Sequence, residues 1–296
     1  MSRPSSFKTL APFDIADGVT LCGDALPVIA GPCAVESEAL VLEVAAEVRA
    51  IGERLGLPMI FKSSFDKANR SSYDSFRSLG FEPALEILQS AKEATGLPIL
   101  TDVHEPHQCE RVAEVANILQ IPAFLCRQTD LITAAARTGR TINLKKGQFM
   151  APDDAPRAVE KARKAGCERI FVTERGYTFG YHNLVVDMRS FEMLHQEGIP
   201  VVFDVTHSLQ LPGGGKQTGG ARQYAEPLAR AAVAAGADGV FIEIHPDPER
   251  ALSDATTQLP PVRAERLLAS LAAIHAAMGG MKDDGTGGET AGSASS

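Results

Sequence analysis

Residues 27–64, PVIAGPCAVESEALVLEVAAEVRAIGERLGLPMIFKSS, contain two short apolar runs separated by a helix-like segment. Between the runs, apolar residues recur at steps of 4, 4, 3 and 4 from Leu40 to Leu55, which places them on one stripe of a helix. A strand, a covering helix and a second strand in this order are typical of parallel strands joined by a crossover helix. The stretch therefore predicts an α/β fold.

The same rhythm continues along the chain. Apolar runs of this kind begin at eight places, at residues 27, 58, 98, 117, 141, 169, 200 and 239. Eight strands with eight helices in about 250 residues match a single (β/α)8 TIM barrel, and a doubly wound open sheet is the alternative fold. We expect the catalytic barrel domain to span 1–278, with an N-terminal β-hairpin at 13–26 closing one end and a disordered tail at 279–296.

The composition narrows the class of protein. With 29 basic and 37 acidic residues in 296, the net charge of -8 argues against a general binder of nucleic acids or anionic membranes. No apolar run is long enough for a membrane span, and the N-terminal residues lack the apolar core of a signal peptide, so we expect a cytoplasmic protein. The five scattered cysteines are expected to be reduced thiols.

Polar residues end almost every predicted strand, where the side chains of a barrel converge on one mouth. Buried charges are costly without partners, so this concentration indicates a functional site. Its basic members suit small anionic substrates, more than one of them. Lys145 and Lys146 are adjacent and should point to opposite sides of their strand, so one of the two is expected outside the site. The strand-end residues are Lys62, Ser64, Lys67, Asn69, Arg70, Asp102, His104, Arg127, Lys145, Lys146, Gln148, Glu174, Arg175, Asp204, His207, Glu243 and His245.

A second group comes from the first, seventh and eighth runs, which become neighbours once a barrel closes. Cys33, His207, Glu243 and Asp254 offer one thiolate, one imidazole and two carboxylates, a plausible site for one Zn²⁺, Fe²⁺, Mn²⁺ or Co²⁺ ion. Taken singly, a cysteine is more often a small buried apolar residue, and a glutamate more often an ion-pair partner. The loops 211–223 and 245–260 are predicted to cover the mouth as mobile lids.

Several longer stretches, in order, resemble the 3-deoxy-D-manno-octulosonate 8-phosphate synthases. The resemblance runs from AGPCAVES at Ala30 to SDATTQLP at Ser253, and its most specific parts are FKSSFDKANRSS at 61–72, TDVHEP at 101–106, PAFLCRQTDL at 122–131, FGYHNLVVDMRS at 179–190 and FDVTHSLQLPGG at 203–214. The related 3-deoxy-7-phosphoheptulonate synthases, which use erythrose 4-phosphate, typically carry a KPRTS-like segment where this chain has KANRSS. This difference favours the five-carbon sugar.

The resemblance implies a homotetrameric transferase of lipopolysaccharide (KDO) biosynthesis. The reaction would join phosphoenolpyruvate, D-arabinose 5-phosphate and water into 3-deoxy-D-manno-octulosonate 8-phosphate and inorganic phosphate. The alternatives are the heptulosonate synthase, a metal-dependent aldolase that releases no phosphate, and a barrel that binds sugar phosphates without turnover.

The resemblance also implies roles for individual residues. Asp102 and His104 are candidates for proton handling, while Lys67, Lys145 and His207 are the other catalytic candidates. Cys33 places the chain in the metal-dependent branch, since the other branch has asparagine there; the ion would orient the aldehyde or position the water. Phosphoenolpyruvate would be bound by Lys62, Ser64, Lys67, Lys145, Gln148 and Arg175, and arabinose 5-phosphate by Asn69, Arg70, Ser71 and, from a neighbouring subunit, Arg127.

Overall fold

The computed structural model describes residue 8 and residues 10–69, 75–212 and 219–283. Eight parallel strands form a closed barrel in which β11, β14 and β3 are successive neighbours, followed by β4 to β8 in chain order. The closed barrel confirms the (β/α)8 prediction and rules out an open sheet. The barrel strands are β3 (Val28–Gly31), β4 (Met59–Lys62), β5 (Ile99–Asp102), β6 (Ile118–Ile121), β7 (Thr141–Lys145), β8 (Ile170–Glu174), β11 (Val201–Asp204) and β14 (Gly239–Glu243).

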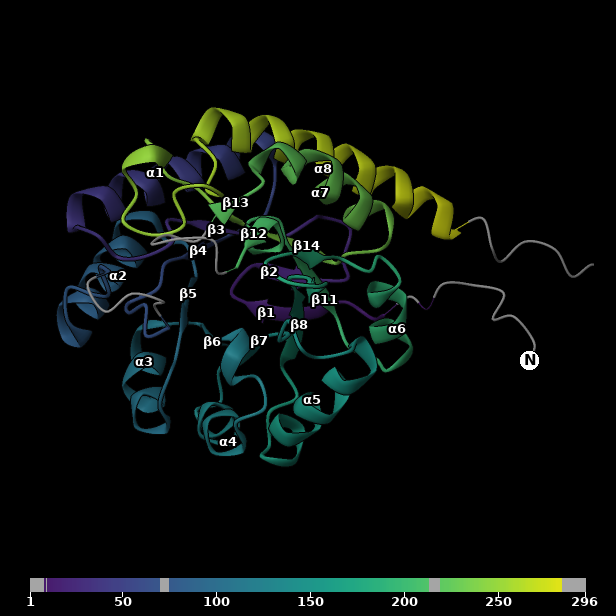
Figure 1. Cartoon of the computed structure of the whole chain (residues 1–296), viewed down its shortest axis with the longest axis horizontal. Coiled ribbons are helices and arrows are strands. Elements are labelled where there is room, and N and C mark those ends of the chain that lie inside the picture. The colour runs from purple at the N-terminus through teal and green to yellow at the C-terminus, as the bar shows by residue number, and fades with distance from the viewer. Residues whose placement is uncertain (1–7, 9, 70–74, 213–218, 284–296) are drawn as a thin grey trace, which may run out of the picture.

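The helices surround the strands, as Figure 1 shows. α8 packs beside α1 and α7, and it runs past Gly279, where the sequence predicts the tail to begin. The remainder of the predicted tail lies outside the described residues. The helices are α1 (Glu38–Leu55), α2 (Phe81–Thr95), α3 (Cys109–Val115), α4 (Thr129–Arg137), α5 (Ala155–Lys164), α6 (Ser190–Gln196), α7 (Ala225–Ala234) and α8 (Pro261–Asp283).

The first helix shows how the local sequence sets an element. The Ser37 side chain accepts a hydrogen bond from the backbone N–H of Leu40, which caps the start of α1. Gly56 ends the helix at φ 65°, a conformation that glycine adopts without strain. In the predicted apolar stripe, Val44 and Val48 are fully buried against the barrel, so the crossover helix predicted from 27–64 is confirmed.

Short elements decorate the loops that follow the strands. β9 (Tyr177–Thr178) pairs with β10 (Leu184–Val185), and β12 (Gln210–Leu211) pairs with β13 (Gly219–Gly220). The latter pair joins the two described ends of the predicted lid at 211–223, whose residues 213–218 lie outside the described part. The 3-10 helices are η1 (Pro106–Gln108), η2 (Ala123–Leu125), η3 (Pro152–Asp154), η4 (His207–Leu209), η5 (Arg222–Tyr224) and η6 (Pro248–Arg250).

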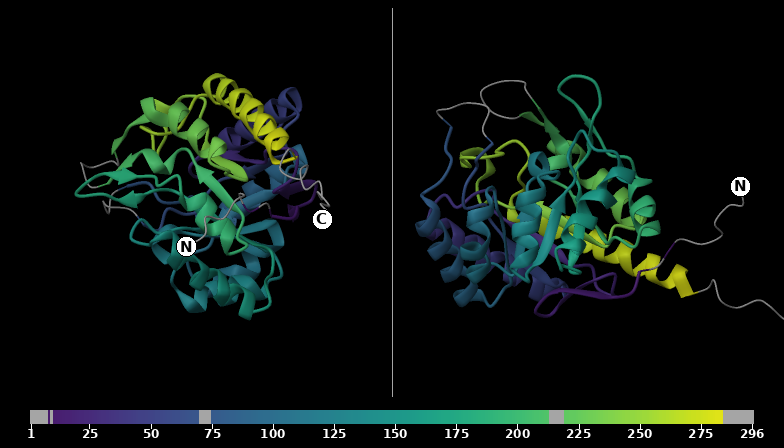
Figure 2. Two further views of the ribbon diagram at one scale, coloured as in Figure 1. Left: turned by 90° about the vertical axis from the view of Figure 1, so that its right-hand side faces the viewer. Right: turned by 90° about the horizontal axis from the view of Figure 1, so that it is seen from below.

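The N-terminal hairpin closes the end of the barrel where the strands begin. β1 (Phe13–Ala16) pairs antiparallel with β2 (Val19–Leu21), as the sequence predicts, and this purple hairpin lies below the barrel in the right-hand view of Figure 2. Ile15 and Leu21 are buried in one apolar cluster with inward-facing side chains of the barrel, because burying them removes apolar surface from water. The barrel members of this cluster are Ile29, Ile60, Leu100, Ile118, Phe171, Val202 and Phe241.

A polar layer lies above the apolar layer inside the barrel. Side chains two residues apart in a strand share a face, so the residue two positions after each apolar member also points inward. Two positions after Ile60, Leu100, Ile118, Val202 and Phe241 come Lys62, Asp102, Gln120, Asp204 and Glu243. The barrel interior is therefore apolar near the hairpin and charged near the carboxyl ends of the strands.

The cysteines and the apolar character of the helices bear on the class of protein. All five cysteines lie in the described ranges, none of them forms a disulfide, and four are buried. Within the described ranges, none of the helices has the length and apolar character needed to cross a membrane.

Candidate functional site

A cavity of about 1070 Å³ opens at the carboxyl ends of the barrel strands. This end of a TIM barrel carries the active site in characterised enzymes of the fold. Cys33 and Glu243 are fully buried directly behind the lining. The predicted site residues that line the cavity are Lys62, Ser64, Lys67, Asn69, Asp102, His104, Lys145, Gln148, Arg175, His207 and Asp254.

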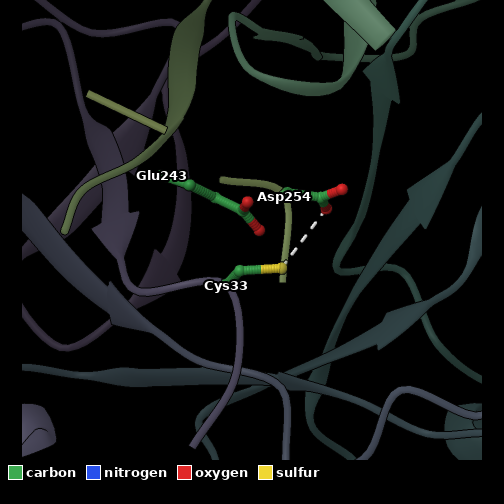
Figure 3. Close-up of side chains that lie close together, drawn as sticks. All are labelled: Cys33, Glu243 and Asp254. Atoms are coloured by element: carbon green, nitrogen blue, oxygen red, sulfur yellow. Dashed lines mark hydrogen bonds between the residues drawn. The ribbon is translucent and has the colours of Figure 1, made fainter. Parts of the chain in front are cut away.

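Three of the four predicted metal ligands form one cluster, and the fourth lies beside it. The ligand atoms of Cys33, Glu243 and Asp254 lie within 4.8 Å of one another, and Figure 3 shows the three side chains pointing together. His207 lies next to these three residues, with its Nε2 3.5 Å from Glu243 Oε1 and 3.5 Å from Asp254 Oδ2. These residues come from β3, β11 and β14, which are adjacent in the barrel, and from the loops that follow these strands. Thiolate, imidazole and carboxylate ligands suit a divalent transition metal.

The backbone leading to Cys33 depends on a glycine. A Cβ atom on Gly31 would lie 2.0 Å from the carbonyl oxygen of Lys62, so only glycine allows β3 to approach β4 this closely. The Cys33 backbone N–H then donates to Gln258 Oε1 at 3.2 Å, and its thiol donates to Ser253 Oγ at 2.9 Å. The loop after β14 therefore fixes the cysteine as well as supplying Asp254.

Asp254 adopts a left-handed backbone conformation with φ 47°, which few residues other than glycine, asparagine and aspartate tolerate. Its carbonyl oxygen accepts hydrogen bonds from the backbone N–H groups of Thr257 and Gln258 at 3.0 and 3.2 Å. Its Oδ1 accepts a hydrogen bond from Gln210 Nε2 at 3.0 Å. Strained conformations of this kind concentrate at functional sites, where the surroundings hold them.

Asp204 orients the imidazole of His207. Nδ1 of His207 lies 2.9 Å from Asp204 Oδ2, and the backbone N–H of His207 donates to Asp204 Oδ1 at 2.8 Å. With the proton on Nδ1 the ring donates to Asp204, which can only accept, while Lys145 Nζ also lies 3.3 Å from Nδ1. Nε2 faces Glu243 and Asp254. This arrangement is typical of metal-binding histidines, whose other ring nitrogen is held by a carboxylate.

Lys62 and Glu243 form a buried ion pair beneath the cavity. Lys62 Nζ donates to Glu243 Oε1 at 2.7 Å and to the carbonyl of Cys33 at 3.0 Å. Burial alone would raise the pKa of Glu243, but Lys62 and His207 outweigh it and lower the pKa to about 2. Glu243 Oε2 is buried and accepts no hydrogen bond from any residue that the structure describes. Since an unpaired buried oxygen is costly, a cation at this point would stabilise the site, and the donor set fits a divalent ion.

Metal binding at this cluster is predicted to strengthen as the pH rises. Burial and the Glu243 carboxylate raise the pKa of the Cys33 thiol well above its usual range, so the free protein holds this proton at neutral pH. A metal takes the thiolate and releases the proton, so affinity should increase by up to about tenfold per pH unit. Cys33→Asn should weaken Co²⁺ binding and flatten this dependence in equilibrium dialysis. Unchanged affinity and slope in the variant would remove Cys33 from the ligand set.

Cationic side chains face the cavity from several strands. Lys67 Nζ donates to Ser64 Oγ at 2.9 Å. Lys145 Nζ donates to Asp204 Oδ2 at 2.6 Å; burial lowers the pKa of Lys145, and Asp204 offsets this only in part. Arg175 is buried, and its Nη1 donates to no group among the residues described. A guanidinium with an unpaired donor beside the cavity is suited to bind an anion.

The neighbouring lysine lies outside the cavity, as strand alternation predicts for one of the two. Lys146 is fully buried behind the barrel, where its Nζ lies 3.5 Å from Glu174 Oε2 and 3.5 Å from the centre of the Tyr177 ring. It also donates to the carbonyl of Met150 at 3.2 Å. Lys146 therefore holds the loops after β7 and β8, whereas Lys145 faces the cavity.

Asp102 and His104 form a pair on the cavity wall. His104 Nε2 lies 2.9 Å from Asp102 Oδ2, and the imidazole ring packs edge-on against Phe65. Burial would raise the pKa of Asp102, but His104 and Lys67 outweigh it and hold the pKa below its usual range. Burial likewise opposes the charged form of His104, yet Asp102 raises its pKa. The pair can hold a proton at the cavity wall.

Some predicted residues are not brought to the cavity of this chain. Arg127 is exposed and is absent from the residues that line the cavity. Arg70 and Ser71, predicted for the sugar phosphate, lie outside the described residues, while Asn69 next to them lines the cavity.

The structure adds residues that the sequence analysis did not assign. Asp204 ends a predicted strand, and its contact with His207, which orients the imidazole, is seen only in the fold. Gln120 lines the cavity, and period-two alternation after Ile118 is the signal that could have found it. Gln258 and Gln210 lie within the quoted stretches SDATTQLP and FDVTHSLQLPGG, but their contacts with Cys33 and Asp254 are seen only in the fold.

Comparison with known proteins agrees with the motifs. The DAHP synthetase I family matches residues 11–277 of this chain. Relatives from Nitrosococcus oceani and Nitratidesulfovibrio vulgaris are 55% and 56% identical over 251 and 248 residues, covering 84% and 83% of this chain and 90% and 91% of those proteins. A relative from Rhodopseudomonas palustris is 54% identical over 269 residues, covering 89% of this chain and 94% of that protein.

All three relatives are named 2-dehydro-3-deoxyphosphooctonate aldolase, another name for the 3-deoxy-D-manno-octulosonate 8-phosphate synthases. The resemblance that the motifs indicate is therefore confirmed. The chain belongs to the DAHP synthetase I family and, within it, groups with the proteins named 2-dehydro-3-deoxyphosphooctonate aldolase.

Proposed function

We propose that the protein is a 3-deoxy-D-manno-octulosonate 8-phosphate synthase, a transferase of lipopolysaccharide biosynthesis. It would condense phosphoenolpyruvate with D-arabinose 5-phosphate and water, giving the eight-carbon sugar acid phosphate and inorganic phosphate. The observation that carries the proposal is the close similarity to relatives with that name over most of both chains. A cavity with cationic walls beside a metal-binding cluster supports it, because both substrates are anions.

In the proposed reaction, C3 of phosphoenolpyruvate attacks the aldehyde carbon of the open-chain sugar. C2 gains cationic character, water adds there, and phosphate leaves with cleavage of its C–O bond. Lys67, Lys145 and Arg175 offset the repulsion between the anionic groups and hold the reacting carbons within attack distance. Lys62, Ser64 and Gln148 complete the proposed phosphoenolpyruvate site, since all line the same cavity.

Arabinose 5-phosphate is proposed to bind across a subunit boundary. Asn69, Arg70 and Ser71 would meet the sugar within one subunit, and Arg127 of a neighbouring subunit would bind its phosphate. The exposed position of Arg127, away from the cavity of its own chain, supports a role toward another subunit. Activity would then depend on the homotetramer, in the cytoplasm.

Proton transfer is proposed for the pair Asp102 and His104. Their separation of 2.9 Å and their place in the cavity wall allow the imidazole to hold a proton beside the substrate oxygen atoms. His104 Nδ1 is buried and forms no hydrogen bond with the residues described, so its hydrogen-bonding capacity is unused in this part of the chain.

One divalent ion is proposed to be held by Cys33, His207, Glu243 and Asp254, with Zn²⁺, Fe²⁺, Mn²⁺ and Co²⁺ as the candidates. Such an ion supplies Lewis-acid polarisation, either of the aldehyde oxygen or of the attacking water. Asp204 keeps His207 in the tautomer that such binding requires, and Lys62 keeps Glu243 ionised.

The choice of sugar is the first prediction to test. Phosphate release from phosphoenolpyruvate is expected with arabinose 5-phosphate and not with erythrose 4-phosphate, because KANRSS at 67–72 stands in place of a KPRTS-like segment. The measurement is a coupled phosphate assay with each sugar in parallel and with phosphoenolpyruvate alone as the blank. Release with only the four-carbon sugar would assign the heptulosonate reaction instead, and release with neither would leave binding without turnover.

A further inference from the structure

Gln210 connects the anion-binding wall of the cavity with the metal-binding cluster. Its Oε1 accepts a hydrogen bond from Arg175 Nη2 at 2.5 Å, and its Nε2 donates to Asp254 Oδ1 at 3.0 Å. The orientation of the amide is fixed by its partners, because a guanidinium can only donate and a carboxylate can only accept. A single rotamer of Gln210 therefore forms hydrogen bonds with both Arg175 and Asp254.

Each partner uses its other atoms toward a ligand site. Arg175 is buried, and its Nη1 has no hydrogen-bond partner among the described residues. Asp254 gives Oδ1 to Gln210 and turns Oδ2 toward the metal cluster, 3.3 Å from Cys33 Sγ and 3.5 Å from His207 Nε2. An anion at Arg175 and a metal at Asp254 would each immobilise a side chain that is hydrogen-bonded to the same amide.

We propose that Gln210 is a positioning residue that couples anion binding at Arg175 to metal binding at Asp254, so that each ligand raises the affinity for the other. The first ligand orders the chain from Arg175 through Gln210 to Asp254, and the second ligand binds to side chains that are already fixed. Asp254 is held in a left-handed backbone conformation, and such conformations concentrate at functional sites. The proposal rests on the proposed function only for the choice of phosphoenolpyruvate as the anion.

Thermodynamic reciprocity makes the coupling measurable from the metal side alone. Co²⁺ is the probe, because its bond to the Cys33 thiolate gives a charge-transfer absorption that reports occupancy of this cluster. The dissociation constant of Co²⁺ is measured with and without phosphoenolpyruvate. In the wild-type protein phosphoenolpyruvate should tighten Co²⁺ binding by about 5- to 150-fold, the usual range for coupled sites.

The coupling ratio is the dissociation constant of Co²⁺ without phosphoenolpyruvate divided by that with phosphoenolpyruvate. Gln210→Leu removes both hydrogen bonds and should bring this ratio close to one. Gln210→Glu still accepts from Arg175 but cannot donate to Asp254, so it should lose the coupling while binding phosphoenolpyruvate alone. Gln196→Leu, at an exposed glutamine on α6, should keep the wild-type ratio. Cys33→Ala provides the blank for Co²⁺ that binds elsewhere or to phosphoenolpyruvate in solution.

A ratio near one in the wild type, or a wild-type ratio in Gln210→Leu, would overturn the proposal; the latter would mean that the charges interact directly through space. Circular dichroism checks folding, and if Gln210→Leu does not fold, the ratio in Gln210→Glu decides. The measurement uses no sugar phosphate and no turnover. Its result therefore stands whether or not the protein releases phosphate with arabinose 5-phosphate, and each proposal can fail without the other.

Discussion

Lys62→Met is expected to lower the free energy of unfolding of the metal-free protein by about 3–5 kcal/mol. The substitution leaves the Glu243 carboxylate buried without the ammonium that now lies 2.7 Å away, and both side chains are almost inaccessible to water. Removing one member of a buried ion pair costs far more stability than the intact pair contributes, because the remaining charge stays buried and keeps its desolvation penalty. Urea unfolding in the presence of a chelator measures the loss.

The loss should depend on pH. The lowered pKa of Glu243, about 2 against the usual 4.5, means that its ion pair adds stability above about pH 4.5 and loses it as the pH falls toward 2. The difference between variant and wild type should therefore shrink in acid. Arg54→Met, which breaks a solvent-exposed pair with Glu265, is the control and should cost little. A neutral-pH loss for Lys62→Met no larger than that of the control would show that the pair does not hold the site.

Removal of the divalent ion is expected to reduce phosphate release by at least about a hundredfold, since a Lewis acid supplies several kcal/mol of transition-state stabilisation. The buried oxygen of Glu243 and the protein-bound proton of Cys33 both indicate that the metal-free cluster is unsuited to act alone. The measurement is phosphate release after dialysis against a chelator, followed by return of Zn²⁺, Mn²⁺ or Co²⁺.

Recovery with one or more ions should restore the initial rate, and a sample dialysed without chelator serves as the control. Full activity in a sample whose metal content is verified as negligible would contradict the prediction. The cluster would then be a structural group of side chains, and the aldehyde and the water would have to be oriented by Lys145, His104 and their neighbours alone.

The sequence was sufficient for the fold because each strand and helix carries its own local signal. The eight apolar runs correspond to the eight barrel strands, and Val44 and Val48 pack where the helical stripe places them. Strand alternation predicts that one of Lys145 and Lys146 lies outside the site, and the family resemblance is needed to choose Lys145, which lines the cavity. The end of α8 was harder to predict from the sequence. The glycines at 279–280 favour a helix end before Asp283, where α8 ends in the structure.

The site was only partly predictable, for a physical reason. Strand-end charges locate the cavity, but the hydrogen bonds that orient them join residues far apart in sequence. Gln210 meets Asp254 across 44 residues and Arg175 across 35, and Gln258 meets Cys33 across 225. An uncharged amide in a loop has no periodicity or composition signal, so such contacts emerge only when the strands are brought together.

In the part of the chain that the structure describes, the hairpin of β1 and β2 covers the end of the barrel where the strands begin. Ile15 and Leu21 pack against the inner apolar layer at that end. In the described structure, a molecule of substrate size can therefore exchange with solvent through the cavity at the carboxyl ends of the strands. Reactants and products would then share one route, and a bound product would block the next arrival. Product that remains in the cavity is therefore expected to inhibit the reaction by occupying space that a new reactant must enter.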